Sequence, residues 1–292
     1  MTLDLRRLEL FVATAEHLNI TRAARSVHLS QQALSSSLAE FERQLGVGLF
    51  ERAGGRLALT EAGRVLAEEA PRLLAAARAL VESTRAAGRG HEQPLRVLRS
   101  PAVSGERVAA LTAPADGPVL VEQQFPSQIW RQLLSGDADL ALVRAAPSHP
   151  GLSSAVVGYD RLRVVVDSGH RLAGRGAVEL PELAGETFVV WGPPGHSAYT
   201  DFLVGVCRAA GFDPELVVTS RQGMPPATAV HDTGWVAFVT DQPGPVAEDA
   251  VVLDLEPPAR VPLQVVWVTD AVPRHAREPL RRIRSDADQR VV

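Results

Sequence analysis

The sequence predicts a multidomain α/β chain with an N-terminal winged helix-turn-helix, one long helix and a C-terminal α/β domain. Three observations indicate this order. Two short capped helix patterns occupy residues 18–45, a single long helical pattern covers residues 60–87, and short β-branched runs alternate with helical patterns beyond residue 94. We expect the three parts to span residues 1–60, 61–93 and 94–292.

The first part contains two short helices joined by a tight polar turn. Asn19 and Ser30 are suited to cap them, because their side chains can accept hydrogen bonds from free backbone N–H groups. After Ser30 the apolar residues recur at helical spacing and define a buried face: Leu34, Leu38, Phe41 and Leu45. The start of this helix carries polar, uncharged side chains: Ser30, Gln31, Gln32, Ser35 and Ser36. That surface is typical of a recognition helix in the major groove of DNA, although a capped helix pair in an ordinary α-bundle has the same pattern.

A two-stranded wing is predicted directly after the helix pair. The segment from Arg52 to Thr60 reads as two short strands with Gly54 and Gly55 at the tip. Arg52 and Arg56 flank this tip, where a winged domain contacts the backbone or the minor groove of DNA. The wing therefore favours DNA binding over the bundle alternative.

Four groups of residues between positions 23 and 63 keep a characteristic order and spacing: Ala23-Ala24, Ser30-Gln31-x-Ala33-Leu34-Ser35, Leu45-Gly46-Val47-x-Leu49-Phe50-Glu51-Arg52 and Leu59-Thr60-x-Ala62-Gly63. In these groups the chain resembles the LysR-type transcriptional regulators. Two positions depart from the family pattern: Gln32 stands where proline is usual, and Ser36 stands where a basic residue is frequent. The resemblance implies a regulator that binds operator DNA as a symmetric dimer or tetramer.

The C-terminal part is expected to be built from short strands and helices. The expected strands, which we take to be parallel, are 95–98, 119–124, 139–143, 162–167, 187–191, 215–219, 235–239 and 262–268. The resemblance implies two lobes like those of periplasmic binding proteins, lobe I at 94–159 and 265–292 and lobe II at 160–264. Only about twenty residues, 103–122, separate the first strand from the end of the second, so the helix there must be short.

A small-molecule effector is expected in the cleft between the two lobes, beyond the strand ends. The candidate effector-binding residues are Ser100, Ser127, Arg144, Trp191, Ser197 and Gln222. The first three also match positions that line the effector pocket in similar regulators. Arg144 is suited to a carboxylate, which it can bind with two parallel hydrogen bonds. An ion pair with an Asp or Glu between the lobes is an equally good interpretation, and Ser197 could simply cap a helix.

The long helix carries an apolar heptad seam of five residues: Leu66, Ala70, Leu73, Ala77 and Leu80. Such a seam needs a partner. The resemblance implies a coiled-coil linker that pairs two subunits, whereas the alternative packs the helix against its own chain. We predict the dimer.

Composition excludes several other classes of protein. The 292 residues carry a net charge of −4, and all 30 basic residues are arginine, so lysine-dependent chemistry such as a P-loop or a Schiff base is excluded. The sequence has no apolar run long enough to span a membrane and no secretory signal, and it has a single cysteine, Cys207, so we expect a cytoplasmic protein.

No catalytic residue, metal site or cofactor is predicted. The segment from Gly195 to Tyr199 suggests a nucleophile elbow but lacks its second glycine, and the eight histidines are scattered. The sequence thus predicts a DNA-binding regulator controlled by a small molecule. The rival interpretation is an α/β solute-binding or enzymatic protein with an N-terminal helical association module.

Overall fold

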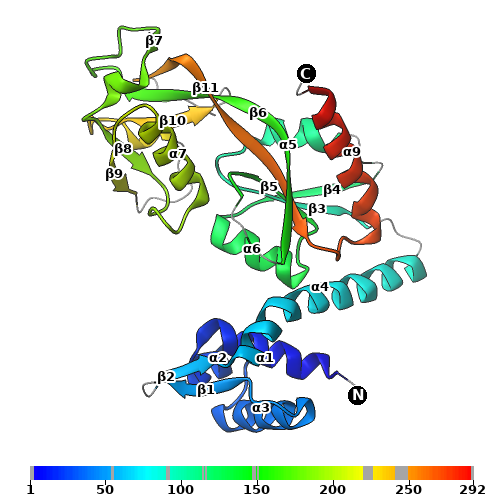
Figure 1. The fold of residues 1–292 in the computed structure, drawn as a ribbon. Coiled ribbons are helices and arrows are strands. Elements are labelled where there is room, and N and C mark those ends of the chain that lie inside the picture. Colours follow the sequence, from blue (N-terminus) through cyan, green and yellow to red (C-terminus); the bar gives the residue numbers. More distant parts are fainter. Residues whose placement is uncertain are drawn as a thin grey trace.

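The computed structural model describes residues 3–53, 56–89, 93–113, 115, 117–146, 149, 151–219, 226–240 and 249–290. A small helical unit with a wing lies at one end of the molecule (Figure 1). A long helix leaves this unit and runs beneath the first of two α/β lobes, and the second lobe lies beyond the first (Figure 1).

The winged unit contains the predicted helix pair, α2 (Ile20–Ser26) and α3 (Gln31–Leu45), and the predicted strands β1 (Phe50–Ala53) and β2 (Arg56–Leu59). They are preceded by α1 (Leu5–His17), which was not predicted from the sequence. Both predicted caps are confirmed. Asn19 Oδ1 accepts from the Arg22 N–H at 3.0 Å, and Ser30 Oγ accepts from the Ala33 N–H at 3.1 Å. The two strands of the wing pair antiparallel, and the expected glycine tip at 54–55 lies outside the described residues.

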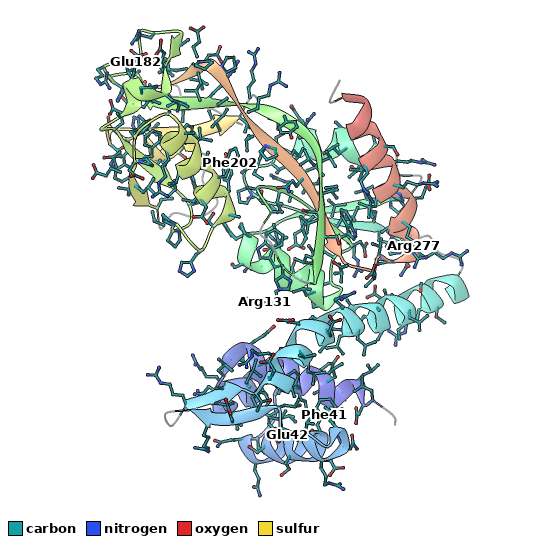
Figure 2. All side chains as sticks on the ribbon, in the orientation of Figure 1. Phe41, Glu42, Arg131, Glu182, Phe202 and Arg277 are labelled. Atoms are coloured by element: carbon teal, nitrogen blue, oxygen red, sulfur yellow. The ribbon has the colours of Figure 1, made fainter. Side chains whose placement is uncertain are left out.

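Aromatic rings hold the winged unit together. Phe11 of α1 lies at the centre, with its ring centroid 6.5 Å from that of Phe41 and 5.4 Å from that of Phe50. Glu42 joins α3 to the wing, because its Oε1 accepts from the backbone N–H groups of Leu49 at 2.6 Å and Phe50 at 3.1 Å. Figure 2 labels the neighbouring Phe41 and Glu42 on α3. These contacts fix the wing relative to the recognition helix.

Helix α4 (Glu61–Arg89) begins directly against the wing. Thr60 Oγ1 caps it by accepting from the Gly63 N–H at 3.0 Å. A Cβ atom at Gly63 would lie only 2.1 Å from the Leu49 carbonyl oxygen, so no larger residue fits there without a shift of the backbone. Glycine at position 63 therefore allows the close packing of α4 on the wing.

Lobe I is built around three parallel strands, β3 (Leu95–Arg99), β4 (Val119–Gln123) and β5 (Leu140–Arg144). Helices α5 (Gly105–Thr112), α6 (Pro126–Ser135) and α9 (Arg274–Arg290) pack around them. Helix α5 has eight residues, which confirms the short helix expected in this segment.

Lobe II contains the parallel pair β8 (Thr187–Val190) and β9 (Glu215–Val218), with strand β10 (Ala237–Thr240) and helix α7 (Ala198–Ala209) beside it. The smaller elements are β7 (Ala177–Val178), the 3-10 helix Leu180–Leu183 and α8 (Pro226–Ala229). Cys207 of α7 is fully buried in the core of this lobe.

Two long strands, β6 (Leu152–Asp167) and β11 (Ala250–Val268), run through both lobes as an antiparallel pair (Figure 1). They place lobe I and part of lobe II in one sheet of order β10-β6-β11-β5-β3-β4. The expectation of short, parallel strands is wrong here. Gly158 and the Pro257-Pro258 pair interrupt the sequence pattern, but the ladder accommodates them at two register breaks.

The hydrophobic cores of the lobes divide along these two strands. Val157 and Leu263 belong to the core of lobe I, whereas Leu162 and Val261 belong to that of lobe II. The chain thus crosses between the lobes at residues 158–161 and returns between Val261 and Leu263. Leu263 lies in lobe I, although the sequence-based range placed it in lobe II.

Candidate DNA-binding surface and effector cleft

The start of α3 forms an exposed polar surface on the side of the winged unit that is turned away from the lobes (Figure 1). Gln31, Gln32 and Ser36 are exposed, and Ser35 is half-buried. Thr21 Oγ1 lies 3.0 Å from Gln31 Oε1 and donates a hydrogen bond to it. Sequence reasoning missed this contact, because Thr21 belongs to the preceding helix.

The wing adds positive charge beside that surface. Arg52 and Arg56 are exposed, on neighbouring strands whose register pairs Ala53 with Arg56. Neither guanidinium has an ion-pair partner among the residues that the structure describes. Both charges are therefore available to a phosphate backbone.

The predicted seam on α4 divides into two faces. Leu66 and Ala70 pack in the core of the winged unit of the same chain, so this part of the seam has an intramolecular partner. Leu73 and Leu80 have 44% and 67% of their surface exposed, and Ala77 is half-buried. An apolar stripe on the outer face of α4 thus remains open in the single chain.

Helix α4 also packs against lobe I of its own chain. Ala75 is buried in one cluster with Ile129 and Leu133 of α6. Arg72 lies 2.9 Å from the Asp270 carboxylate, and Arg78 donates to the carbonyl oxygen of Ser135. The linker helix is therefore held by both domains.

A chain of charged groups leads from α4 into lobe I. Glu82 of α4 lies 3.3 Å from the Arg96 guanidinium, which donates to Asp139 Oδ1 at 2.8 Å, and His275 Nε2 lies 3.0 Å from Asp139 Oδ2. Burial of Asp139 raises its pKa, but the hydrogen bonds from His275 and Arg96 outweigh this effect, and the pKa of Asp139 is lowered.

Two of the predicted effector residues of lobe I, Ser100 and Arg144, lie at the ends of the neighbouring strands β3 and β5. The Ser100 N–H donates to the Leu142 carbonyl at 3.0 Å, and Arg144 Nε donates to the Ala102 carbonyl at 3.2 Å. Both side chains are buried. The topology therefore places Ser100 and Arg144 together, as the strand ends predict.

A carboxylate of the chain itself occupies Arg144. Arg144 Nη2 donates to Asp160 Oδ2, and Arg107 Nη2 of helix α5 lies 3.4 Å from Asp160 Oδ1. This is the ion-pair interpretation that the sequence left open, with Asp160 on the strand that crosses between the lobes. A Cβ atom at Gly158 would lie 2.7 Å from Arg107 Nη2, so a larger residue there would require the end of the Arg107 side chain to shift.

Tyr199 brings the second lobe to this group. It lies in the first turn of α7, and burial raises the pKa of its phenol, while Arg144 lowers it and Asp160 raises it. The phenol thus lies within electrostatic reach of the Arg144–Asp160 pair. Sequence reasoning missed Arg107, Asp160 and Tyr199, since none of them follows a strand that the pattern revealed.

The other predicted effector residues have local roles or stand apart. Ser127 is exposed in the first turn of α6, and half-buried Trp191 packs beside lobe II residues such as Val189. Ser197 Oγ caps α7 by accepting from the Thr200 N–H at 3.3 Å. Gln222 lies outside the described residues.

Two further features lie apart from the predicted effector residues. A cavity of about 430 Å³ at the register break of β11 is lined by Arg161, Leu162 and residues 254–258, and includes none of the predicted effector residues. Asp167, His231 and Asp232 bring possible metal ligands within 4.8 Å of one another, but His231 pairs with both carboxylates, at 3.5 and 3.4 Å.

Among the described residues, none of the helices has both the length and the apolar character that crossing a membrane requires.

A winged helix-turn-helix joined by a long helix to a two-lobed domain defines a class of protein, the transcription regulators with an effector-binding domain. Residues 5–64 match the family profile described as bacterial regulatory helix-turn-helix protein, lysR family, and residues 118–287 match that of the LysR substrate binding domain. The chain belongs to the LysR family of transcriptional regulators.

Named relatives and solved structures agree with this assignment. The transcriptional regulator TfdS of Cupriavidus pinatubonensis is 31% identical over 220 residues, which cover 73% of this chain and 74% of the relative. The structure of full-length CbnR with its target DNA has a TM-score of 0.56 at 22% identity and covers 98% of this chain and all of that one. Full-length OxyR from Pseudomonas aeruginosa has a TM-score of 0.59 at 18% identity, with 98% of this chain and 95% of that chain covered. At these identities the two structures support the fold alone.

Proposed function

We propose that this regulator reads a specific operator with the start of α3 and binds the DNA backbone with its wing. The observation that carries the proposal is the exposed, uncharged start of α3 on the outer side of the winged unit. Gln31 can form two hydrogen bonds with adenine, while Ser30, Gln32, Ser35 and Ser36 lie around it. Arg52 and Arg56 supply charge without reading sequence.

Two copies are proposed to act together through the open stripe of α4. Leu73 and Leu80 are exposed apolar residues in a helix that also packs on both domains, which supports a second chain as the covering partner. A twofold dimer or tetramer would then read an operator of twofold symmetry.

The effector is proposed to be a small anion that binds between the lobes beside Arg144. The buried guanidinium supports this site, as does its electrostatic influence on Tyr199 of the other lobe. Ser100 directly follows the neighbouring strand β3. We propose Ser127, Trp191, Ser197 and Gln222 as further effector-binding residues. We propose that the chain acts in the cytoplasm by binding alone and catalyses no reaction.

Binding of two variants to operator and scrambled DNA across a salt series tests the DNA-binding roles. Gln31→Ala should weaken operator binding by about 1–3 kcal/mol and leave binding to scrambled DNA unchanged. Arg56→Ala should weaken binding to operator and scrambled DNA alike. It should also lower the magnitude of the salt slope, which is the change in log affinity with log salt concentration, by about one unit. Equal loss on both DNAs for Gln31→Ala, or an unchanged slope for Arg56→Ala, would contradict the assignment.

A further inference from the structure

We infer that Arg107 and Asp160 set the charge of the effector, and that together with Arg144 they select a molecule with one negative charge. The inference rests on the proposed function, in which an anion binds beside Arg144. It concerns two residues, on α5 and on the crossing strand, that the strand-end reasoning did not include.

The group formed by Arg107, Arg144 and Asp160 has more positive than negative charge. Two guanidinium groups of lobe I meet a single carboxylate, and their side chains are largely removed from water, with exposed fractions of 2% for Arg144, 15% for Asp160 and 23% for Arg107. Over the described residues, neither arginine has a second carboxylate within 4.0 Å. One positive charge thus remains without a partner, and a buried charge is costly unless it is paired.

Three hydrogen-bonding atoms of the same region are unused. Arg144 Nη1, Arg107 Nε and Ser100 Oγ are all buried, and none has a hydrogen-bond partner within the described chain. The other donors of Arg144 are engaged, Nε with the Ala102 carbonyl and Nη2 with Asp160. A carboxylate has two oxygens that can each accept more than one hydrogen bond, so it is an acceptor suited to such unused donors.

A second negative charge on the effector would face Asp160. Asp160 is already bound to both arginines, so a dianion must either displace it or lie beside it. Like charges at such a distance repel strongly where water is excluded. A monoanion brings the group to neutrality, whereas a dianion leaves it with excess negative charge.

Four forms of the protein test this charge balance. The formal charges of Arg107, Arg144 and Asp160 add up to +1 in the wild type, 0 in Arg107→Gln and +2 in Asp160→Asn. In the double variant that combines both substitutions, the sum is again +1. Each full-length form is titrated calorimetrically at constant ionic strength with matched acids, butyrate against succinate and benzoate against phthalate. Arg144→Gln serves as the control without the central guanidinium.

The wild type should bind each monocarboxylate at least about tenfold more tightly than its dicarboxylate partner, a difference that one extra charge pair readily supplies. Asp160→Asn should shift this ratio toward the dicarboxylate by about tenfold or more. Arg107→Gln should weaken all four acids, and the double variant should regain the preference for one charge. Circular dichroism of each free variant checks the fold, since Asp160→Asn leaves Arg144 without its partner. The more exposed Arg107 provides the independent variant if Asp160→Asn does not fold.

The outcomes separate this inference from the proposed effector site. If the acids bind to the wild type and not to Arg144→Gln, but the ratio of affinities is the same in all forms that retain Arg144, the anion site stands and the charge selection is wrong. If a dicarboxylate binds best to the wild type, the inference is likewise overturned. If no acid binds to any form, both the anionic effector and its selection are contradicted.

Discussion

The guanidinium of Arg78 in helix α4 lies 3.3 Å from the Glu9 carboxylate of helix α1 and also donates to the backbone carbonyl of Ser135 at the end of α6. One side chain therefore contacts the winged unit and lobe I at once. Gly136 follows Ser135 with a φ of +76°, and its ideal Cβ position lies 3.3 Å from Ala75 Cα, so α4 packs tightly on lobe I at the same place. A movement of lobe I relative to the winged unit must break or reshape this bridge.

Arg78→Ala should loosen the contact between the two domains. Both partners of Arg78 are partly exposed, so we expect a loss of about 1 kcal/mol and about fivefold faster amide exchange in the middle of α4. Glu9→Gln, which removes one of the two contacts, should have a smaller effect. Exchange in α4 that is unchanged in both variants would show that the bridge does not hold the helix.

Leu73→Asp should separate the subunits. It places a carboxylate in the exposed apolar stripe of α4, which would cost several kcal/mol if a second chain covers it. Light scattering should then report a smaller species, with loss of operator binding. Arg85→Asp puts the same charge elsewhere on α4 and should leave the oligomer intact. A Leu73→Asp protein of unchanged mass would mean that the stripe is not the interface.

Thr21→Val should weaken operator binding through Gln31. The Thr21 hydroxyl donates to Gln31 Oε1 at 3.0 Å and holds the amide in one orientation before DNA arrives. Loss of a neutral hydrogen bond at an exposed site predicts a decrease of about 0.5–1.5 kcal/mol on operator DNA only. Thr21→Ser retains the hydroxyl and should bind as the wild type does. In a Gln31→Ala background, Thr21→Val should have no further effect.

Asp139 should contribute to unfolding in acid. Its pKa is lowered in the folded chain, so its stabilisation is complete above the unfolded value of about 3.9 and is lost as the pH falls through the lower folded value. Asp139→Asn should reduce the free energy of unfolding by roughly 2–3 kcal/mol at neutral pH, because it weakens the contacts with Arg96 and His275. Unfolding curves between pH 2 and about 7 should show a smaller acid dependence in the variant. Parallel curves for both proteins would contradict this role.

Cys207 should be unreactive in the native protein. Burial raises the pKa of its thiol to about 11, so only about one molecule in ten thousand carries the thiolate at neutral pH. Reaction with a disulfide reagent should be slow in buffer and fast in denaturant. Rapid labelling of the native protein would show that lobe II opens far more often than its packed core indicates.

The winged unit is the part of the fold that the sequence predicted best, because its helix caps and buried helix faces depend on residues that are close together in the chain. Asn19, Ser30 and Thr60 cap helices within three residues of their own positions, so the turn chemistry is visible in the sequence. The spacing of Leu34, Leu38 and Phe41 likewise reports one buried helix face. These caps and this buried face can therefore be recognised from short stretches of the sequence.

The candidate effector site around Arg144 depends on contacts between distant segments, and the sequence predicted it only in part. Ser100 and Arg144 could be found because they end strands with clear apolar patterns. Asp160 lies in a strand whose first half reads as irregular, since Gly158 and exposed Tyr159 interrupt the alternation of apolar and polar residues. Its pairing with Arg107 appears only when α5 is placed over that strand.

The two long strands decide how the lobes can move. Between the register breaks, residues 158–162 of β6 stay paired with residues 259–263 of β11, so the connection is a hydrogen-bonded ribbon. A ribbon resists twisting in proportion to the angle, unlike a flexible linker, which swivels freely. Closure of the lobes around an effector would then twist the paired strands, and the strands would favour a return of the lobes to the open arrangement when the effector leaves.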